Sequence, residues 1–190
     1  ILAVSQFNDV ADLWDMQTGE KLHTLEGHDF VVDDVDFSPD CKHLLTASGD
    51  GTAKIWDVAT GEELLTLSGA GAHLFTASFS PDGTVAAAGG RNRDVLLWDA
   101  STGEFLRRLS GPEQELWDLE FSPDGASLVS AGLEGVVYIW DVATGRLLQT
   151  LPGSPSGGAA NVEFTPDGQT LVNARDDGMV RFWNWFSRTN

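Results

Sequence analysis

Apolar residues in this chain occur in short runs, and turn-forming residues interrupt them within every dozen positions or so. Several of these runs end at a tryptophan, as in residues 54–56, 95–98 and 136–140. No stretch keeps the period near 3.6 residues that an amphipathic helix requires. Short apolar runs bounded by Gly, Pro and Asp are typical of strands joined by tight turns. The pattern predicts an all-β chain with about four short strands in each repeating unit.

The repeating unit is marked by a Trp-Asp pair that recurs every 42 residues, at positions 14, 56, 98 and 140, with Trp183-Asn184 following after 43. A Ser-Pro-Asp turn, or Thr-Pro-Asp in the last copy, keeps the same spacing at residues 38–40, 80–82, 122–124 and 165–167. Thr-Gly closes each unit at 18–19, 60–61, 102–103 and 144–145. Pro fixes φ, Asp bonds its own backbone and Gly supplies positive φ, so both markers predict hairpin turns. Self-similarity at this period indicates a repeat architecture.

With these markers the chain resembles the WD-repeat β-propeller family over essentially all its residues. The resemblance implies one four-stranded antiparallel blade per unit, with Trp-Asp ending the third strand. Trp117-Asp118 is out of phase with the markers and falls in an innermost strand. The expected units are a partial blade at 1–25, complete blades at 26–67, 68–109 and 110–151, and a blade lacking a clear last strand at 152–190.

This scheme gives three strands in the first unit, twelve in the three complete blades and three in the last unit. The total corresponds to about four and a half blades. A ring of seven blades, which is common in the family, would need about 294 residues at this repeat length. The chain therefore predicts a partial ring with open edges. We expect those edges to be completed by further polypeptide of the same chain, by a second copy or by another subunit, and we favour the first.

The resemblance also implies a hydrogen-bonded tetrad of His, Ser/Thr, Asp and Trp that holds a blade together. In the second unit His28, Thr46, Asp50 and Trp56 match it. The other units lack one or more members, so we expect uneven blade stability, with the Trp56 blade the best protected.

Composition excludes several functions. The 29 Asp and Glu residues outnumber 11 Lys and Arg, which gives a net charge of −18 and argues against binding to nucleic acid or an anionic membrane surface. No apolar run approaches the roughly 20 residues of a membrane helix, so no membrane insertion is expected. Cys41 is the only cysteine, which excludes an internal disulfide. The acidity fits either a high-salt habitat or a basic partner. The compartment stays open, with a slight preference for the cell interior.

Catalytic and metal-binding patterns are not evident. The histidines occupy different phases of the repeat, and the acidic groups at 33–36 and 176–177 lack calcium-loop spacing. His73 is either a displaced tetrad histidine or a loop residue. We predict no catalytic residue, no cofactor and no metal.

One end of the ring offers candidates for partner binding. The resemblance implies that the loops before the innermost strands and between the second and third strands share one face, which is the commonest docking surface in the family. Aromatic residues and arginine dominate binding hot spots, and these loops carry Phe30, Phe75, Arg91, Arg93, Trp117 and Arg175. The alternative is that the aromatics simply begin buried inner strands.

The sequence therefore predicts a non-catalytic scaffold for protein–protein interaction, within a larger WD-repeat protein or a multi-subunit complex. The alternative is a structural or regulatory propeller module attached to an enzymatic domain, such as a kinase or protease, outside these residues.

Overall fold

The computed structural model describes residues 1–5, 8–133, 135–153, 159–175 and 178–185. Within them the chain forms eighteen strands and no helix, which confirms the all-β prediction. Consequently no described helix is long and apolar enough to cross a membrane.

The strands form five antiparallel sheets that follow one another along the chain. The first sheet contains β1 (Leu2–Ser5), β2 (Val10–Trp14) and β3 (Lys21–Glu26). The three complete blades are β4 (Val32–Phe37), β5 (His43–Ser48), β6 (Ala53–Asp57) and β7 (Glu63–Leu67); β8 (Leu74–Phe79), β9 (Val85–Gly90), β10 (Val95–Asp99) and β11 (Phe105–Leu109); and β12 (Leu116–Phe121), β13 (Ser127–Gly132), β14 (Val137–Asp141) and β15 (Leu147–Leu151). The last sheet contains β16 (Ala159–Phe164), β17 (Thr170–Arg175) and β18 (Val180–Asn184).

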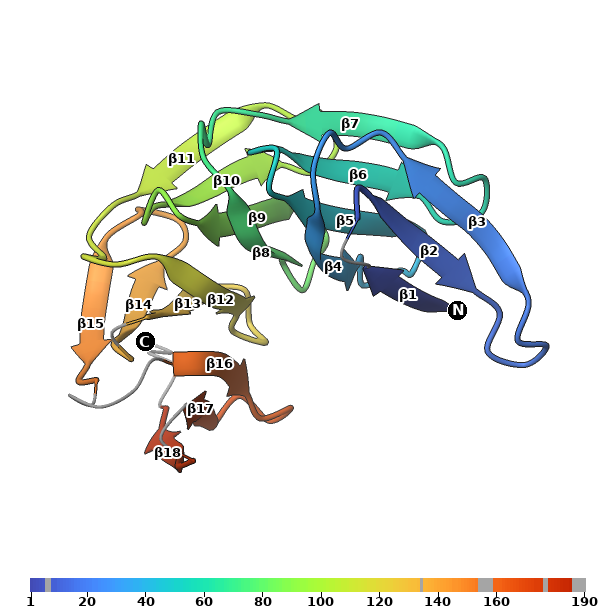
Figure 1. Cartoon of the computed structure of the whole chain (residues 1–190). Helices are drawn as coiled ribbons and strands as arrows, with labels where there is room; N and C mark the ends of the chain where they lie inside the picture. Colours follow the sequence, from blue (N-terminus) through green and yellow to red (C-terminus); the bar gives the residue numbers. More distant parts are fainter. Residues whose placement is uncertain (6–7, 134, 154–158, 176–177, 186–190) are drawn as a thin grey trace.

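The sheets are arranged around an arc that does not close (Figure 1). The first strand of each complete blade lies on the inside of the arc, where β4, β8, β12 and β16 follow one another. Among the described residues, the strand count of three, twelve and three is confirmed, and the open arc fits a partial propeller. The exact unit boundaries stay predictions.

The core lies between neighbouring sheets rather than within a single one. Trp56, Trp98 and Trp140, the tryptophans of the repeat marker, are each 1% exposed. Each one packs at the junction with the preceding sheet, as Trp56 does with Leu13 and Leu25. Burial of such large rings at every junction stabilises the stacking of blades.

The turns between the first and second strands confirm the local reading of Ser-Pro-Asp-Gly. In each turn the Ser or Thr hydroxyl donates to the Asp carboxylate, as from Ser80 to Asp82 at 2.7 Å. Gly83 has φ 72°, and its counterpart in the first such turn is Cys41, with φ 57°. Left-handed backbone is unfavourable for a residue with a Cβ atom.

We therefore expect Cys41→Gly to raise the free energy of unfolding by roughly 0.5–1 kcal/mol, since the side chain is exposed and removing it sacrifices no core contact. Thermal unfolding under reducing conditions measures the change. Cys41→Ala is the control, because it keeps the Cβ atom and should bring no gain. Equal gains from both variants would show that the turn conformation is not the cause.

Candidate functional site

A β-bulge begins the inner strand of each complete blade. The pairing register shifts between Val32 and Asp34, between Leu74 and Thr76, and between Leu116 and Asp118. The extra residue in each case is Asp33, Phe75 or Trp117, which are 42 residues apart. A bulge redirects the side chain of its extra residue. These three side chains therefore belong to one end of the inner strands and not to the regular alternation along them.

Aromatic rings from two loops and two bulges form a continuous row at this end. The ring centroids of Phe30 and His73 are 6.0 Å apart, those of His73 and Phe75 4.4 Å, and those of Phe75 and Trp117 5.8 Å. We call Phe30, His73, Phe75 and Trp117 the aromatic row. It crosses the three complete blades.

Much of the row is accessible to solvent. Phe30 is 57% exposed and Trp117 is 50% exposed, while Phe75 is partly buried. The alternative that the aromatics merely begin buried inner strands is therefore wrong for Phe30 and Trp117. Large exposed aromatics side by side are typical of interaction surfaces.

Two local features hold the row in place. His73 Nε2 lies 2.6 Å from Asp33 Oδ2, so the bulge residue of one blade fixes the ring of the next. Gly49 lies beneath the row, and a Cβ atom there would collide with the rings of Phe30 and His73. The row thus depends on the contact between His73 and Asp33 and on a glycine at position 49.

Two of the three predicted arginines lie beside the row. Arg91 and Arg93 are exposed; Arg91 Nε lies 3.3 Å from Glu115 Oε1, and Arg93 Nη1 donates to the Glu113 carbonyl at 3.3 Å. Arg175 is different, because it is only 6% exposed and its Nη1 donates to the Gly135 carbonyl at 3.4 Å. Its side chain therefore offers little exposed surface to a partner, and its guanidinium contacts the loop of the neighbouring blade.

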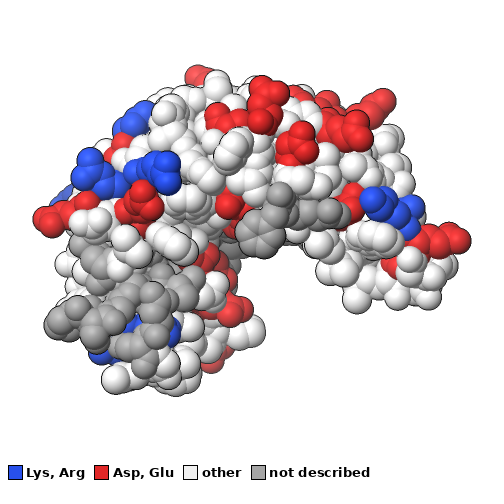
Figure 2. All heavy atoms as spheres, in the orientation of Figure 1, with Lys and Arg blue, Asp and Glu red and all other residues white. Residues whose placement is uncertain are grey.

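Below the row, the inner strands line a concave groove on the inside of the arc. Figure 2 shows acidic side chains on this concave side, while many of the Lys and Arg residues in view gather near β11. The polar side chains that line this inner groove are Asp34, Asp36, Ser78, Asp118, Glu120, Asn161 and Glu163.

Four of these carboxylates join one blade to the next. The backbone N–H groups of Ala77 and Phe79 on β8 donate to Asp34 and Asp36 on β4, at 3.0 and 2.7 Å. The backbone N–H groups of Val162 and Phe164 on β16 donate to two carboxylates of β12, those of Asp118 and Glu120, both at 2.6 Å. The carboxylates therefore satisfy backbone donors of the following inner strand.

Burial in the groove makes ionisation of these groups unfavourable. It raises the pKa of Asp118 to about 7 and the pKa of Glu120 to about 7, against the lowering effect of the backbone N–H bonds. Burial also raises the pKa of Asp34 and of Asp36. Carboxylates with raised pKa values in a concave site are typical of functional sites.

A family model for the WD domain, G-beta repeat, matches residues 19–57, 61–99, 103–141 and 145–184. The chain belongs to this WD-repeat family. A comparison with curated proteins found no match.

In the WD-repeat blade β4–β7, the structure brings the predicted tetrad together. His28 Nδ1 lies 2.8 Å from Asp50 Oδ2, and His28 Nε2 lies 2.7 Å from Thr46 Oγ1. The indole N–H of Trp56 donates to the same hydroxyl at 3.0 Å. Burial lowers the pKa of His28, against the raising effect of the adjacent Asp50 carboxylate.

The other WD repeats satisfy their tryptophans differently. Trp140 donates to Ser130 Oγ at 3.1 Å, and Trp98 donates to the Ser68 carbonyl at 3.2 Å. His73 is thus neither a displaced tetrad histidine nor an inert loop residue, since it belongs to the aromatic row. The carboxylates expected at 134 and 177, and the pair 176–177, lie outside the described residues.

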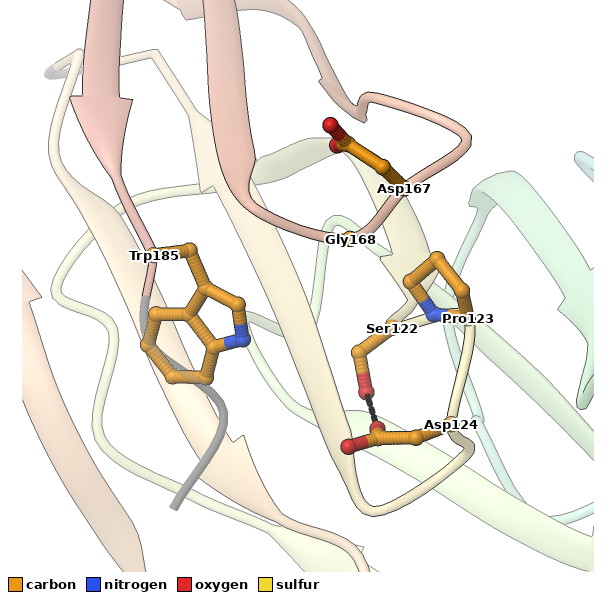
Figure 3. A pocket seen from close by; sticks show the side chains of 6 residues that line it. All are labelled: Ser122, Pro123, Asp124, Asp167, Gly168 and Trp185. Carbon is orange, nitrogen blue, oxygen red and sulfur yellow. Dashed lines mark hydrogen bonds between the residues drawn. The ribbon is translucent and has the colours of Figure 1, made fainter. Parts of the chain in front are cut away.

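The opposite end of the inner strands has a smaller pocket between two Pro-Asp turns (Figure 3). Trp185 closes one side of it, and Asp124 accepts a hydrogen bond from Ser122 at 2.6 Å, so its polar groups already serve the turn. Within the part of the chain that the structure describes, His, Cys, Asp and Glu side chains form no group of three or more suited to a metal ion.

Sequence reasoning identified most of the aromatic row but missed its organisation. The bulge positions share the 42-residue spacing, and so do residues 34, 76 and 118 in the groove below. Comparing the repeats position by position could have found both sets.

Proposed function

We propose that the chain is a non-catalytic scaffold that binds a protein partner through the aromatic row. One observation supports this above the others: four rings from three successive blades lie side by side, and the outer two are about half exposed. Membership of the WD-repeat family fits a role in protein interaction. Because the row is built on blade ends fixed by buried tryptophans, it needs little reorganisation on binding.

We also propose that the edge strand of the last sheet is covered in the working protein by another strand. Val137 and Ile139 on β14 are each 1% exposed, because a fourth strand and a further blade cover them. Their counterparts on β18, Val180 and Phe182, are 54% and 69% exposed. Exposed strand edges promote association. Further polypeptide of this chain, a second copy or another subunit could each supply the covering strand.

Substitution of the row tests the scaffold role. We expect Trp117→Ala to reduce capture of the partner at least tenfold, because tryptophan is enriched among the residues that carry most of the binding energy at interfaces. Arg91→Ala should give a smaller loss, since its guanidinium is exposed and already paired with Glu115. Quantitative mass spectrometry of proteins retained from an extract of the producing cells measures both.

The matched control is Phe105→Ala, which removes an aromatic of 47% exposure on the outer strand β11. Proteins whose retention falls equally with Phe105→Ala and with Trp117→Ala bind through non-specific hydrophobic contacts. If no retained protein depends on Trp117 or Arg91, the row is not the docking surface and the proposal is wrong.

A further inference from the structure

We propose that the inner groove binds a positively charged side chain of a basic protein segment that docks on the aromatic row. This inference rests on the docking role proposed above and adds the chemistry of the partner. It follows from the oxygen-bearing side chains below the row, their lack of cationic partners and the position of one buried hydroxyl among them.

Successive inner strands place oxygen-bearing side chains at two levels of the groove. The level next to the aromatic row contains Asp34, Thr76, Asp118 and Asn161. The deeper level contains Asp36, Ser78, Glu120 and Glu163. Trp117 immediately precedes Asp118, and Phe75 immediately precedes Thr76, so the two rings and the first level come from neighbouring backbone positions.

The partly buried carboxylates of the groove have no positive charge to compensate them within the described chain. None of the ion pairs among the described residues includes Asp34, Asp36, Asp118 or Glu120. Each oxygen of Asp34 and of Asp118 accepts one backbone N–H, which leaves lone pairs available. Buried carboxylates without a partner charge are costly, and an incoming cation removes that cost.

Thr76 supplies an independent indication. It is only 2% exposed, and its hydroxyl makes no hydrogen bond of regular geometry among the described groups, although the Asp34 carboxylate lies close by. A buried hydroxyl without a partner costs free energy that a ligand donor can recover. In the pairing register, Thr76 holds on β8 the position that Asp34 holds on β4 and Asp118 holds on β12.

The geometry favours an organic cation over a metal ion. The described carboxylates do not converge in a group that could hold a metal. A lysine or arginine carries several N–H donors on a long apolar stem, so its stem can pack on Phe75 and Trp117 while its charged end reaches the oxygens below. The chain's net charge of −18 adds a long-range attraction for a basic segment.

Matched peptides test this proposal on the full chain. Four fluorescent peptides share leucine-rich flanks, which can contact the row, and differ only in a central arginine, lysine, citrulline or glutamate. Citrulline keeps the shape of arginine without its charge. We expect the arginine and lysine peptides to bind at least tenfold more tightly than the citrulline peptide in fluorescence anisotropy, and the glutamate peptide to bind most weakly.

The variant Asp34→Asn/Asp118→Asn should abolish that discrimination. Its amide oxygens can still accept the N–H bonds from Ala77 and Val162, so the blades should stay joined, which circular dichroism checks. The control Glu20→Gln/Glu104→Gln removes the same charge at exposed sites and should keep the discrimination.

Three outcomes would overturn the inference: equal binding of the citrulline and arginine peptides, discrimination that survives in Asp34→Asn/Asp118→Asn, or no binding of any peptide to the unaltered chain. If Trp117→Ala weakens a citrulline peptide that binds as well as the arginine peptide, the row is a docking surface while the groove takes no cation. That result separates failure of this inference from failure of the proposed function.

Discussion

Replacing Thr46 with valine is expected to lower the free energy of unfolding of its blade by about 3 kcal/mol. Valine has nearly the same shape, so packing against Trp56 changes little. The lost hydroxyl leaves both the indole N–H of Trp56 and Nε2 of His28 without their partner, at 3.0 and 2.7 Å respectively. Each unpaired buried polar group costs about 1–3 kcal/mol.

Ser130→Ala is the matched control, because the Ser130 hydroxyl serves Trp140 at 3.1 Å without a histidine. It should cost about 1–2 kcal/mol, since one donor is left unpaired. Repeat proteins open blade by blade, so hydrogen exchange measured separately for β4–β7 and β12–β15 is the appropriate method. Equal loss of protection in the two variants would contradict a special role for the tetrad. The unaltered chain should show its strongest protection in β4–β7.

The second large effect concerns pH. Asp118→Asn/Glu120→Gln should stabilise the chain relative to the unaltered protein by on the order of 3 kcal/mol at pH 8, and by little near pH 4. Both carboxyls have a pKa of about 7 when folded, against ordinary values near 4. The folded state therefore holds these protons more tightly, and stability is lost as pH rises from about 4 to about 7.

At each pH the free energy of unfolding of the unaltered chain is subtracted from that of the variant. Contributions from other titrating groups, which both proteins share, then cancel. His28, for example, has a lowered pKa and acts in the opposite direction, because acidification protonates a buried imidazole. The groups that face Asp118 and Glu120 are Asp34 and Asp36 on β4 and Glu163 on β16, and their charges add to the cost of ionisation. Urea unfolding from pH 4 to pH 8 gives the comparison. A difference that does not grow with pH would show that these carboxylates ionise without penalty.

Much of the fold could be predicted because the same sequence markers recur every 42 residues. Trp56 and its equivalents, together with the Pro-Asp turns, fixed both the number and the order of the strands. The tetrad of His28, Thr46, Asp50 and Trp56 was implied by the resemblance to the WD-repeat family, and the structure brings its members together. The Trp-Asp pairs and the turns are local and recur at a constant interval, so the sequence displays them directly.

The site was less predictable, for reasons that particular residues make clear. Arg175 has the phase of a surface residue but is buried by the preceding blade, which only three-dimensional packing reveals. The bonds from Ala77 to Asp34 and from Val162 to Asp118 connect neighbouring blades through backbone N–H groups. Such bonds leave no mark in the sequence, because any residue except proline can donate them.

The bulge at the start of each inner strand has an evolutionary consequence. The residues on either side of it, such as Leu116 and Asp118, serve the core and the junction between blades. Trp117 between them serves neither, and Phe75 holds the same place in the preceding blade. Asp33 holds it in the first complete blade but pairs with His73 of the next. Mutation at positions 75 and 117 can change what the surface displays while the interior stays intact. A lineage can therefore exchange one binding partner for another by altering a single residue per blade, and the scaffold need not be rebuilt.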